Sequence, residues 1–225
     1  MFDYLIKNGH VIDGTGSPAR RADVGIANGR IAAIGDLKTA PAGAVIDAEG
    51  KYVTPGFIDI HRHADAAVLR PDFGGLELKQ GLTTIVNGNC GLSVTPCRGA
   101  YQKEIQAYLT PITGALPEGR DFSSLEAYLK AAEAEPKRIN TAMLTGTGTI
   151  RACTAGFGVP KLDCAQLKTV HALLEQELAA GALGVSLGLG YAPDCFYSTE
   201  ELIKALRPLT HSGIPITVHM RQEGS

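Results

Sequence analysis

The rhythm of apolar segments after Pro55 constrains the fold more than any other feature of this chain. Short apolar runs rich in β-branched residues alternate there with stretches of helical periodicity. The runs lie at 56–61, 83–88, 140–146, 183–188 and 215–220. Such runs are typical of strands buried on both faces, and strands that alternate with helices form a parallel sheet. The pattern therefore predicts an α/β fold, either doubly wound or a barrel.

Residues 1–55 follow a different pattern, with short apolar/polar alternations separated by turn signals. In "ADVGIANGRIAAIG" two alternating segments flank Asn28-Gly29, a pair that tolerates the positive φ angles of a type I′ turn. In "VIDAEGKYVTPG" the pair Glu49-Gly50 predicts a second hairpin. We therefore expect a small β region over residues 1–55, separate from an α/β region over residues 56–225.

Composition narrows the classes of function. The chain has 225 residues and a formal net charge of −2, without the basic runs that bind nucleic acid or an anionic membrane. No apolar run reaches the roughly 18 residues of a membrane span, and the N-terminus lacks the pattern of a signal peptide. We therefore expect a cytoplasmic protein. Five cysteines, an odd number without repeated spacing, argue against a disulfide framework.

Potential metal ligands lie at the ends of three of the predicted strands. His61 and His63 follow the first strand, Cys90 the second, and His219 ends the fifth. Because carboxyl ends of parallel strands gather at one edge, these side chains are expected to meet. Histidines at i and i+2 on an extended segment point the same way. A lone histidine or cysteine is more often a core residue, but imidazole and thiolate together suit zinc. His10, His171 and His211 do not converge and are taken as structural.

Several motifs resemble one known family. "GFIDIHRHAD" at 56–65 resembles the metal-binding signature of the amidohydrolase superfamily. The opening segment from Asp3 is similar to the N-acyl-D-amino-acid deacylase (D-aminoacylase) branch. Three later motifs resemble that branch in order, namely "GNCG" at 88–91, "GALGVSLGLGY" at 181–191 and "HMRQEG" at 219–224. The cysteine motif is the most specific of these.

The resemblance implies an incomplete (β/α)8 TIM-type barrel of about five βα units, over residues 56–225, preceded by part of a small β-sandwich over residues 1–55. It implies one or two zinc ions. His61 and His63 would hold the more exposed position, and Cys90 with His219 the deeper one. In related cyclic-amide hydrolases a carboxylated lysine bridges the metals, whereas the strand at 183–188 contains no lysine, which favours Cys90 in that role.

The implied activity is zinc-dependent hydrolysis of the amide bond of N-acyl-D-amino acids, small molecules that yield a carboxylate and a D-amino acid. Tyr191 and Arg221 are candidate substrate-binding residues, although a packed tyrosine and a solvated arginine are the alternatives. The family's catalytic aspartate has no counterpart before Ser225, so no catalytic residue is assigned.

Four carboxylates near the motifs, Asp59, Asp65, Asp194 and Glu223, offer no convincing substitute for that aspartate. We therefore expect the 225-residue chain alone to be catalytically silent. An inactive metal-binding fragment or pseudoenzyme is one alternative function. A cyclic-amide hydrolase of the hydantoinase or dihydroorotase type is another. The side-chain preference and the oligomeric state are not predicted.

Overall fold

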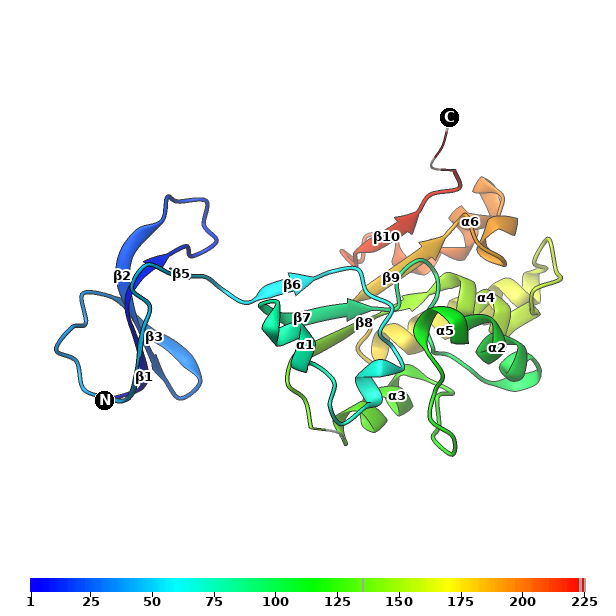
Figure 1. Ribbon diagram of the computed structural model, residues 1–225. Coiled ribbons are helices and arrows are strands. Elements are labelled where there is room, and N and C mark those ends of the chain that lie inside the picture. The colour runs from blue at the N-terminus through cyan, green and yellow to red at the C-terminus, as the bar shows by residue number, and fades with distance from the viewer. Residues whose placement is uncertain (135, 223, 225) are drawn as a thin grey trace. The chain divides into compact units, whose positions relative to one another are not determined.

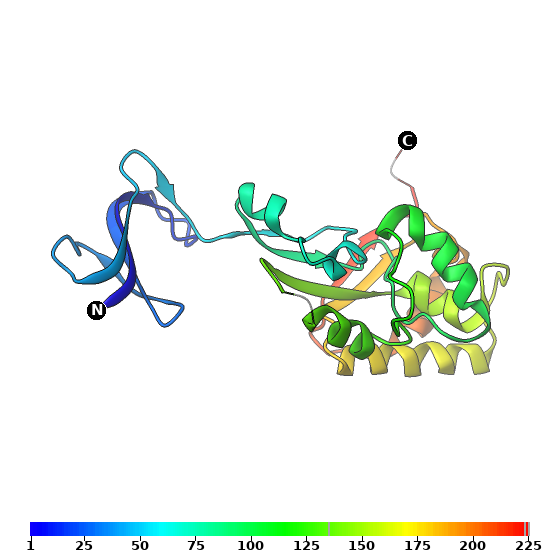
Figure 2. The same ribbon diagram turned by 60° about the horizontal axis from the view of Figure 1, so that its bottom comes forward.

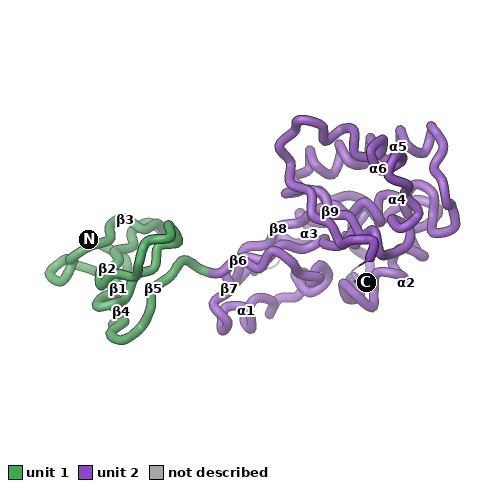
Figure 3. Tube along the Cα trace, turned by 90° about the horizontal axis from the view of Figure 1, so that it is seen from above, with its two compact units in different colours: residues 1–56 green, residues 57–225 purple. Residues whose placement is uncertain are grey.

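The computed structural model describes residues 1–134, 136–222 and 224. It divides into two compact units, residues 1–56 and residues 57–225, which Figure 3 draws in different colours. Within the described residues, no helix combines the length and the apolar character needed to cross a membrane.

The first unit is a single sheet of five strands. These are β1 (Phe2–Val11), β2 (Arg20–Ala27), β3 (Arg30–Gly35), β4 (Ala42–Asp47) and β5 (Tyr52–Val53). Their order is β3-β2-β1-β4, and β5 also pairs with β1. The predicted hairpin is confirmed, since β2 and β3 run antiparallel through Asn28 and Gly29, whose φ angles are 53° and 68°.

The second predicted hairpin, at Glu49-Gly50, is wrong. Strands β4 and β5 do not pair with each other; both run parallel to β1, beside Phe2–Lys7 and then beside His10–Val11. The positive φ of Gly50, 70°, does belong to a turn, but the chain then continues in its former direction. Alternation predicts that a segment is a strand. It does not reveal that a ten-residue strand is long enough to pair with two short ones.

The second unit alternates strands with helices. Its strands are β6 (Phe57–Asp59), β7 (Leu82–Asn87), β8 (Asn140–Gly146), β9 (Gly184–Gly188) and β10 (Ile216–His219). Its α-helices are α1 (Gly75–Lys79), α2 (Gln102–Thr113), α3 (Leu125–Glu133), α4 (Thr147–Ala155), α5 (Cys164–Ala179) and α6 (Thr199–Ala205). Short 3-10 helices are η1 (Ala67–Leu69), η2 (Gly99–Tyr101), η3 (Asp194–Phe196) and η4 (Arg207–Leu209).

The five strands form one parallel sheet in the order β10-β9-β8-β7-β6 (Figure 1). This order follows the chain without the reversal that marks a doubly wound sheet. The predicted α/β class is confirmed, and the sheet is a curled parallel half-barrel. The ribbon in Figure 2 places α3 and α5 along one side of this sheet.

Two apolar clusters join the helices to the sheet. One contains Ile85 of β7, Met143 of β8 and Leu125 of α3, and the other contains Val185 of β9 and Leu174 of α5. All five are at most 3% exposed. The buried faces of the helices thereby fix the central strands β7, β8 and β9, and Cys90, in the loop after β7, belongs to the first cluster.

Candidate metal centre

The structure brings the four predicted ligands together at the carboxyl ends of the strands. Ligand atoms of His61, His63 and Cys90 all lie within 4.8 Å of one another. The Cys90 Sγ is 3.3 Å from Nε2 of His61 and 3.9 Å from Nδ1 of His219. His61 follows β6 and His219 ends β10, so the donors come from both outer strands of the sheet and from the loop after β7.

These donors fit zinc. Ligands at 2.0–2.3 Å from a tetrahedral ion lie about 3.3–3.8 Å from each other, the edge of that tetrahedron. The two separations from the Cys90 Sγ, 3.3 Å and 3.9 Å, fall close to this range. Two imidazoles and one thiol are also the donor types that zinc prefers. Their role as ligands stays a prediction.

His63 has the properties of a ligand position. Its Nδ1 is buried and has no hydrogen-bond partner among the described residues. Burial, and then the charge of His61, lowers the pKa of His63. The two rings stand edge to face with their centroids 5.5 Å apart. A lowered pKa keeps the imidazole neutral at neutral pH, and only the neutral ring can offer a lone pair to a metal.

The Cys90 thiol is presented by an unusual loop. Gly88, Cys90 and Gly91 all have positive φ, at 73°, 58° and 72°, and Cys90 is only 7% exposed. A non-glycine residue in this conformation is uncommon, and it persists where the surrounding structure holds it. The glycines on either side of Cys90 are therefore required by the backbone of the loop.

Two buried asparagines, Asn87 and Asn89, hold the histidine segment. The Asn89 side chain donates to the carbonyl oxygens of Val86 at 2.9 Å and, more weakly, of Ile60 at 3.4 Å. The Asn87 side-chain oxygen accepts the N–H of Ala64 at 3.0 Å. These contacts flank His61 and His63 in the chain. The sequence signal for this role is the position of Asn87 and Asn89 at the end of a predicted strand.

Arg62, between the paired histidines, takes no part in the cluster. Its guanidinium forms ion pairs with Glu77 of α1 at 3.0 Å and with Asp59 at 3.6 Å. The alternation of an extended segment explains this, because successive side chains point to opposite sides.

Of the two candidate substrate-binding residues, Tyr191 lies at the cluster. Its ring centroid is 4.5 Å from that of His219. Arg221 donates to the backbone carbonyl of Cys195 at 3.3 Å and to that of Tyr197. Some N–H donors of the Arg221 guanidinium are therefore used in hydrogen bonds to the backbone at η3. Both substrate-binding roles stay predictions.

The carboxylates near the cluster occupy different environments. Asp59 accepts the N–H of His61 at 3.1 Å. Burial raises the pKa of Asp65 to about 7, against the smaller effect of nearby backbone N–H groups, and neither oxygen makes a well-formed hydrogen bond. Asp194 is 1% exposed and accepts the N–H of Gly188 at the end of β9 at 2.9 Å. Glu223 lies outside the described residues.

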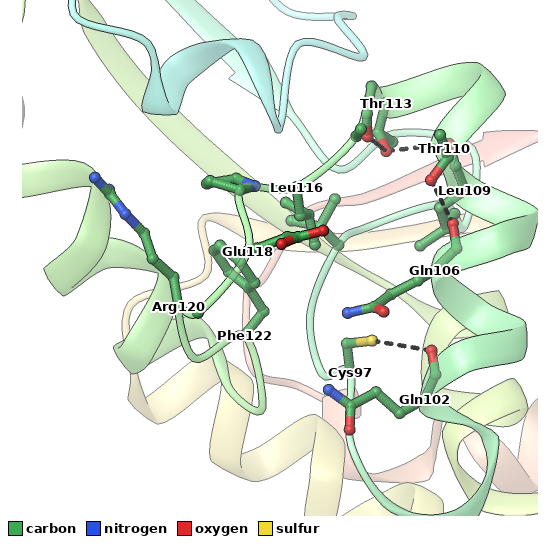
Figure 4. A pocket seen from close by; sticks show the side chains of 15 residues that line it. Cys97, Gln102, Gln106, Leu109, Thr110, Thr113, Leu116, Glu118, Arg120 and Phe122 are labelled. Atoms are coloured by element: carbon green, nitrogen blue, oxygen red, sulfur yellow. Dashed lines mark hydrogen bonds between the residues drawn. The ribbon is translucent and has the colours of Figure 1, made fainter.

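A separate cavity of about 390 Å³ opens between α2 and residues 114–122. Figure 4 shows Gln102, Gln106 and Phe122 around it, with the Cys97 thiol donating to the Gln102 carbonyl. None of the four candidate ligands lines this cavity. It is therefore not the space in which a metal-bound substrate would lie.

Comparison with known proteins points to one family. A family model described as the amidohydrolase family matches residues 44–104. The chain is 40% identical over 230 aligned residues to a D-aminoacylase of Alcaligenes xylosoxydans xylosoxydans, an alignment that covers 99% of this chain and 45% of that protein.

Two solved structures are similar over almost the whole chain. A crystal structure of D-aminoacylase superposes with a TM-score of 0.86 at 38% identity, covering 99% of this chain and 46% of the other. An N-acyl-D-glutamate deacylase from Bordetella bronchiseptica, complexed with zinc and a phosphonate inhibitor that mimics the tetrahedral intermediate, has a TM-score of 0.82 at 36% identity with the same coverage. The chain thus spans less than half the length of these relatives.

Proposed function

We propose that this chain, which belongs to the amidohydrolase superfamily, contains the zinc-binding part of an N-acyl-D-amino-acid deacylase. It matches the N-terminal part of proteins of the D-aminoacylase branch. The observation that carries the proposal is the position of the Cys90 Sγ, 3.3 Å from His61 Nε2 and 3.9 Å from His219 Nδ1. A thiolate between imidazoles from both outer strands suits a metal centre better than a packed core.

The reaction we propose is hydrolysis of a linear amide, which releases a carboxylate and a D-amino acid. A zinc ion held there would supply Lewis acidity, which would polarise an amide carbonyl and make water more acidic. The chain's own residues hold the metal and orient the substrate. His61, His63, Cys90 and His219 bind one or two ions, and the nearby Tyr191 hydroxyl is proposed to donate to the substrate.

Arg221 is proposed to meet the carboxylate of the amino-acid product. A guanidinium has five N–H donors in a planar fork, so the two contacts to the Cys195 and Tyr197 carbonyls leave donors for a carboxylate. The N-acyl-D-glutamate deacylase structure, whose inhibitor mimics the tetrahedral intermediate, supports this substrate class.

The fold proposed for the functional enzyme is a complete (β/α)8 barrel with a small β-sandwich. Both outer strands of the half-barrel expose apolar side chains, as expected if further strands cover them. In β6, Ile58 is 62% exposed, and in β10, Val218 is 49% exposed. In the first unit Val45 of β4 is 58% exposed, which supports a second sheet against it.

The cyclic-amide alternative is less well supported, because β9 holds no lysine that could be carboxylated. The alternative function of a different class is a metal-binding protein without catalytic activity. It shares the metal site and differs in turnover, so metal analysis and an amide hydrolysis assay must both be made.

Metal analysis of the purified chain tests the site. We expect about one equivalent of zinc, lost in Cys90→Ala and His219→Ala because each removes a donor from the cluster. Cys153→Ala is the matched control, since this partly buried thiol donates to the Arg98 carbonyl at 3.5 Å and packs against the apolar core. Zinc content that is unchanged in Cys90→Ala would refute the proposed centre.

A further inference from the structure

We propose that Ser186 of β9 is the positioning residue that holds Cys90 in its metal-binding orientation. The inference rests on the zinc centre proposed above and adds a residue that itself offers no ligand. Ser186 lies 95 residues from Gly91 in the chain, yet its hydroxyl contacts both ends of the segment 88–91 that contains Cys90.

The Ser186 hydroxyl closes this segment with two hydrogen bonds. Its Oγ accepts the N–H of Gly91 at 2.9 Å and donates its proton to the carbonyl of Gly88 at 2.5 Å. Ser186 is 0% exposed. A hydroxyl is one of the few side-chain groups that can donate and accept from a single atom. An alanine or valine at this position would leave the Gly88 carbonyl and the Gly91 N–H without that partner.

The conformation of the segment requires such support. Three of its four residues, Gly88, Cys90 and Gly91, have positive φ, and for cysteine this conformation is unfavourable on its own. Thr149 of α4 donates its N–H to the Gly91 carbonyl at 3.1 Å, which fixes only one end. Ser186 is the side chain that ties the residue before Asn89-Cys90 to the residue after it.

The neighbouring strands leave space only for backbone here. A Cβ placed on Gly88 would come 2.1 Å from the Leu144 carbonyl oxygen, and one placed on Gly188 would come 2.0 Å from the Cys90 carbonyl oxygen. The segment 88–91 thus packs directly against the backbone of β8 and β9, and the Ser186 hydroxyl forms its two hydrogen bonds at this contact. By fixing the backbone on both sides of Cys90, Ser186 fixes the direction in which the thiol points toward His61.

Cobalt(II) in place of zinc makes the thiolate ligand visible, because a cobalt–thiolate bond gives a charge-transfer band in the near ultraviolet. The 225-residue chain is titrated with Co²⁺ as wild type, Ser186→Ala, Thr145→Val and Cys90→Ala. We expect Ser186→Ala to bind Co²⁺ about 10–100-fold more weakly, as outer-shell substitutions do, with a weaker band for each bound ion.

Thr145→Val is the matched control. Thr145 is a buried hydroxyl residue on the adjacent strand β8, is 1% exposed, and its Oγ1 has no hydrogen-bond partner among the described residues. Its substitution should leave both affinity and band unchanged. Ser186→Thr, which keeps a hydroxyl, should bind Co²⁺ close to wild type and decides the matter if Ser186→Ala does not fold by circular dichroism.

The outcomes separate this inference from the proposed function. A wild-type chain without the band, or a band that survives in Cys90→Ala, refutes the zinc centre and this inference with it. A normal band in the wild type together with wild-type affinity and band in Ser186→Ala overturns the positioning role alone. Equal losses in Ser186→Ala and Thr145→Val also overturn it, because they would reflect general destabilisation of the sheet.

Discussion

Asp194 is a buried acid that joins three parts of the half-barrel. Its carboxylate accepts the N–H of Gly188 at 2.9 Å and the hydroxyl of Thr147. Burial raises the pKa of Asp194 to about 6, although these two hydrogen bonds oppose the shift. The folded state therefore holds a proton on this group at a pH where the unfolded chain has released it.

The pH dependence of stability follows from that difference. Between about pH 4 and pH 6 the folded state binds more protons through Asp194 than the unfolded state, so its contribution to the free energy of unfolding falls as the pH rises. Asp194→Asn removes this dependence. Urea unfolding of the metal-free chain should show the variant gaining on the wild type between pH 4 and pH 7, by about 2–3 kcal/mol at most. A difference that does not change with pH would contradict the assignment.

At the scale of residues, the candidate metal ligands were predictable from the sequence, whereas the residues that hold them in place were not. Histidine and cysteine at strand ends are visible in the sequence because residue type and position coincide. The contacts of Asp194, Asn89 and Ser186 depend on which backbone atoms meet them across the fold, and Ser186 reaches Gly88 from 98 residues away. A serine within an apolar strand was the only available hint.

Among the elements, β9 shows how closely a strand can pack on a loop. Gly188 ends this strand, and a Cβ there would lie 2.0 Å from the Cys90 carbonyl oxygen. Gly188→Ala should lower the free energy of unfolding by about 3 kcal/mol, because backbone rather than a flexible side chain must move. It should also abolish metal binding.

The control for this substitution is Gly158→Ala, since nothing lies within 4 Å of a Cβ at that position. Urea unfolding should leave the Gly158→Ala midpoint almost unchanged. Should Gly188→Ala match the control in both stability and metal content, the close approach of β9 to the Cys90 loop would be incorrect.

The strands of the half-barrel were predictable because each is a short apolar run with clear limits. The run predicted at 140–146 forms β8 over the same residues, and that at 56–61 shrinks to β6 at Phe57–Asp59. The partner of β5 was not predictable. Pairing in the first unit depends on the length of β1, because β1 is long enough to pair with both β4 and β5 along one edge.

For the whole molecule, the proton transfers of amide hydrolysis are the weak point. Asp59 is paired with Arg62 at 3.6 Å, while Asp65 and Asp194 are buried, so no described carboxylate near the cluster is both accessible and unpaired. General acid–base catalysis is typically worth 10²–10⁴-fold. We therefore predict that the zinc-loaded 225-residue chain releases no measurable D-methionine from N-acetyl-D-methionine over hours. Turnover that is lost in Cys90→Ala would contradict this prediction.

The convergence of both sheet edges on one sulfur has a consequence for exchange dynamics. Strands β6 and β10 are separated by three others, yet His61 and His219 both lie beside the Cys90 Sγ. An ion bound by all three would be a reversible cross-link between the margins of the sheet, and linkage requires it to oppose any opening that separates them.

Hydrogen–deuterium exchange would measure that cross-link strand by strand. If β10 opens only after the ion leaves, zinc at 100 times its dissociation constant should slow exchange of the β10 amides by up to about 100-fold. The amides of β1 to β3, in the other compact unit, serve as the internal reference and should not respond. Protection that rises in β7 but not in β10 would mean that the ion leaves His219 unbound and that the outer strand of the half-barrel exchanges as it does without metal.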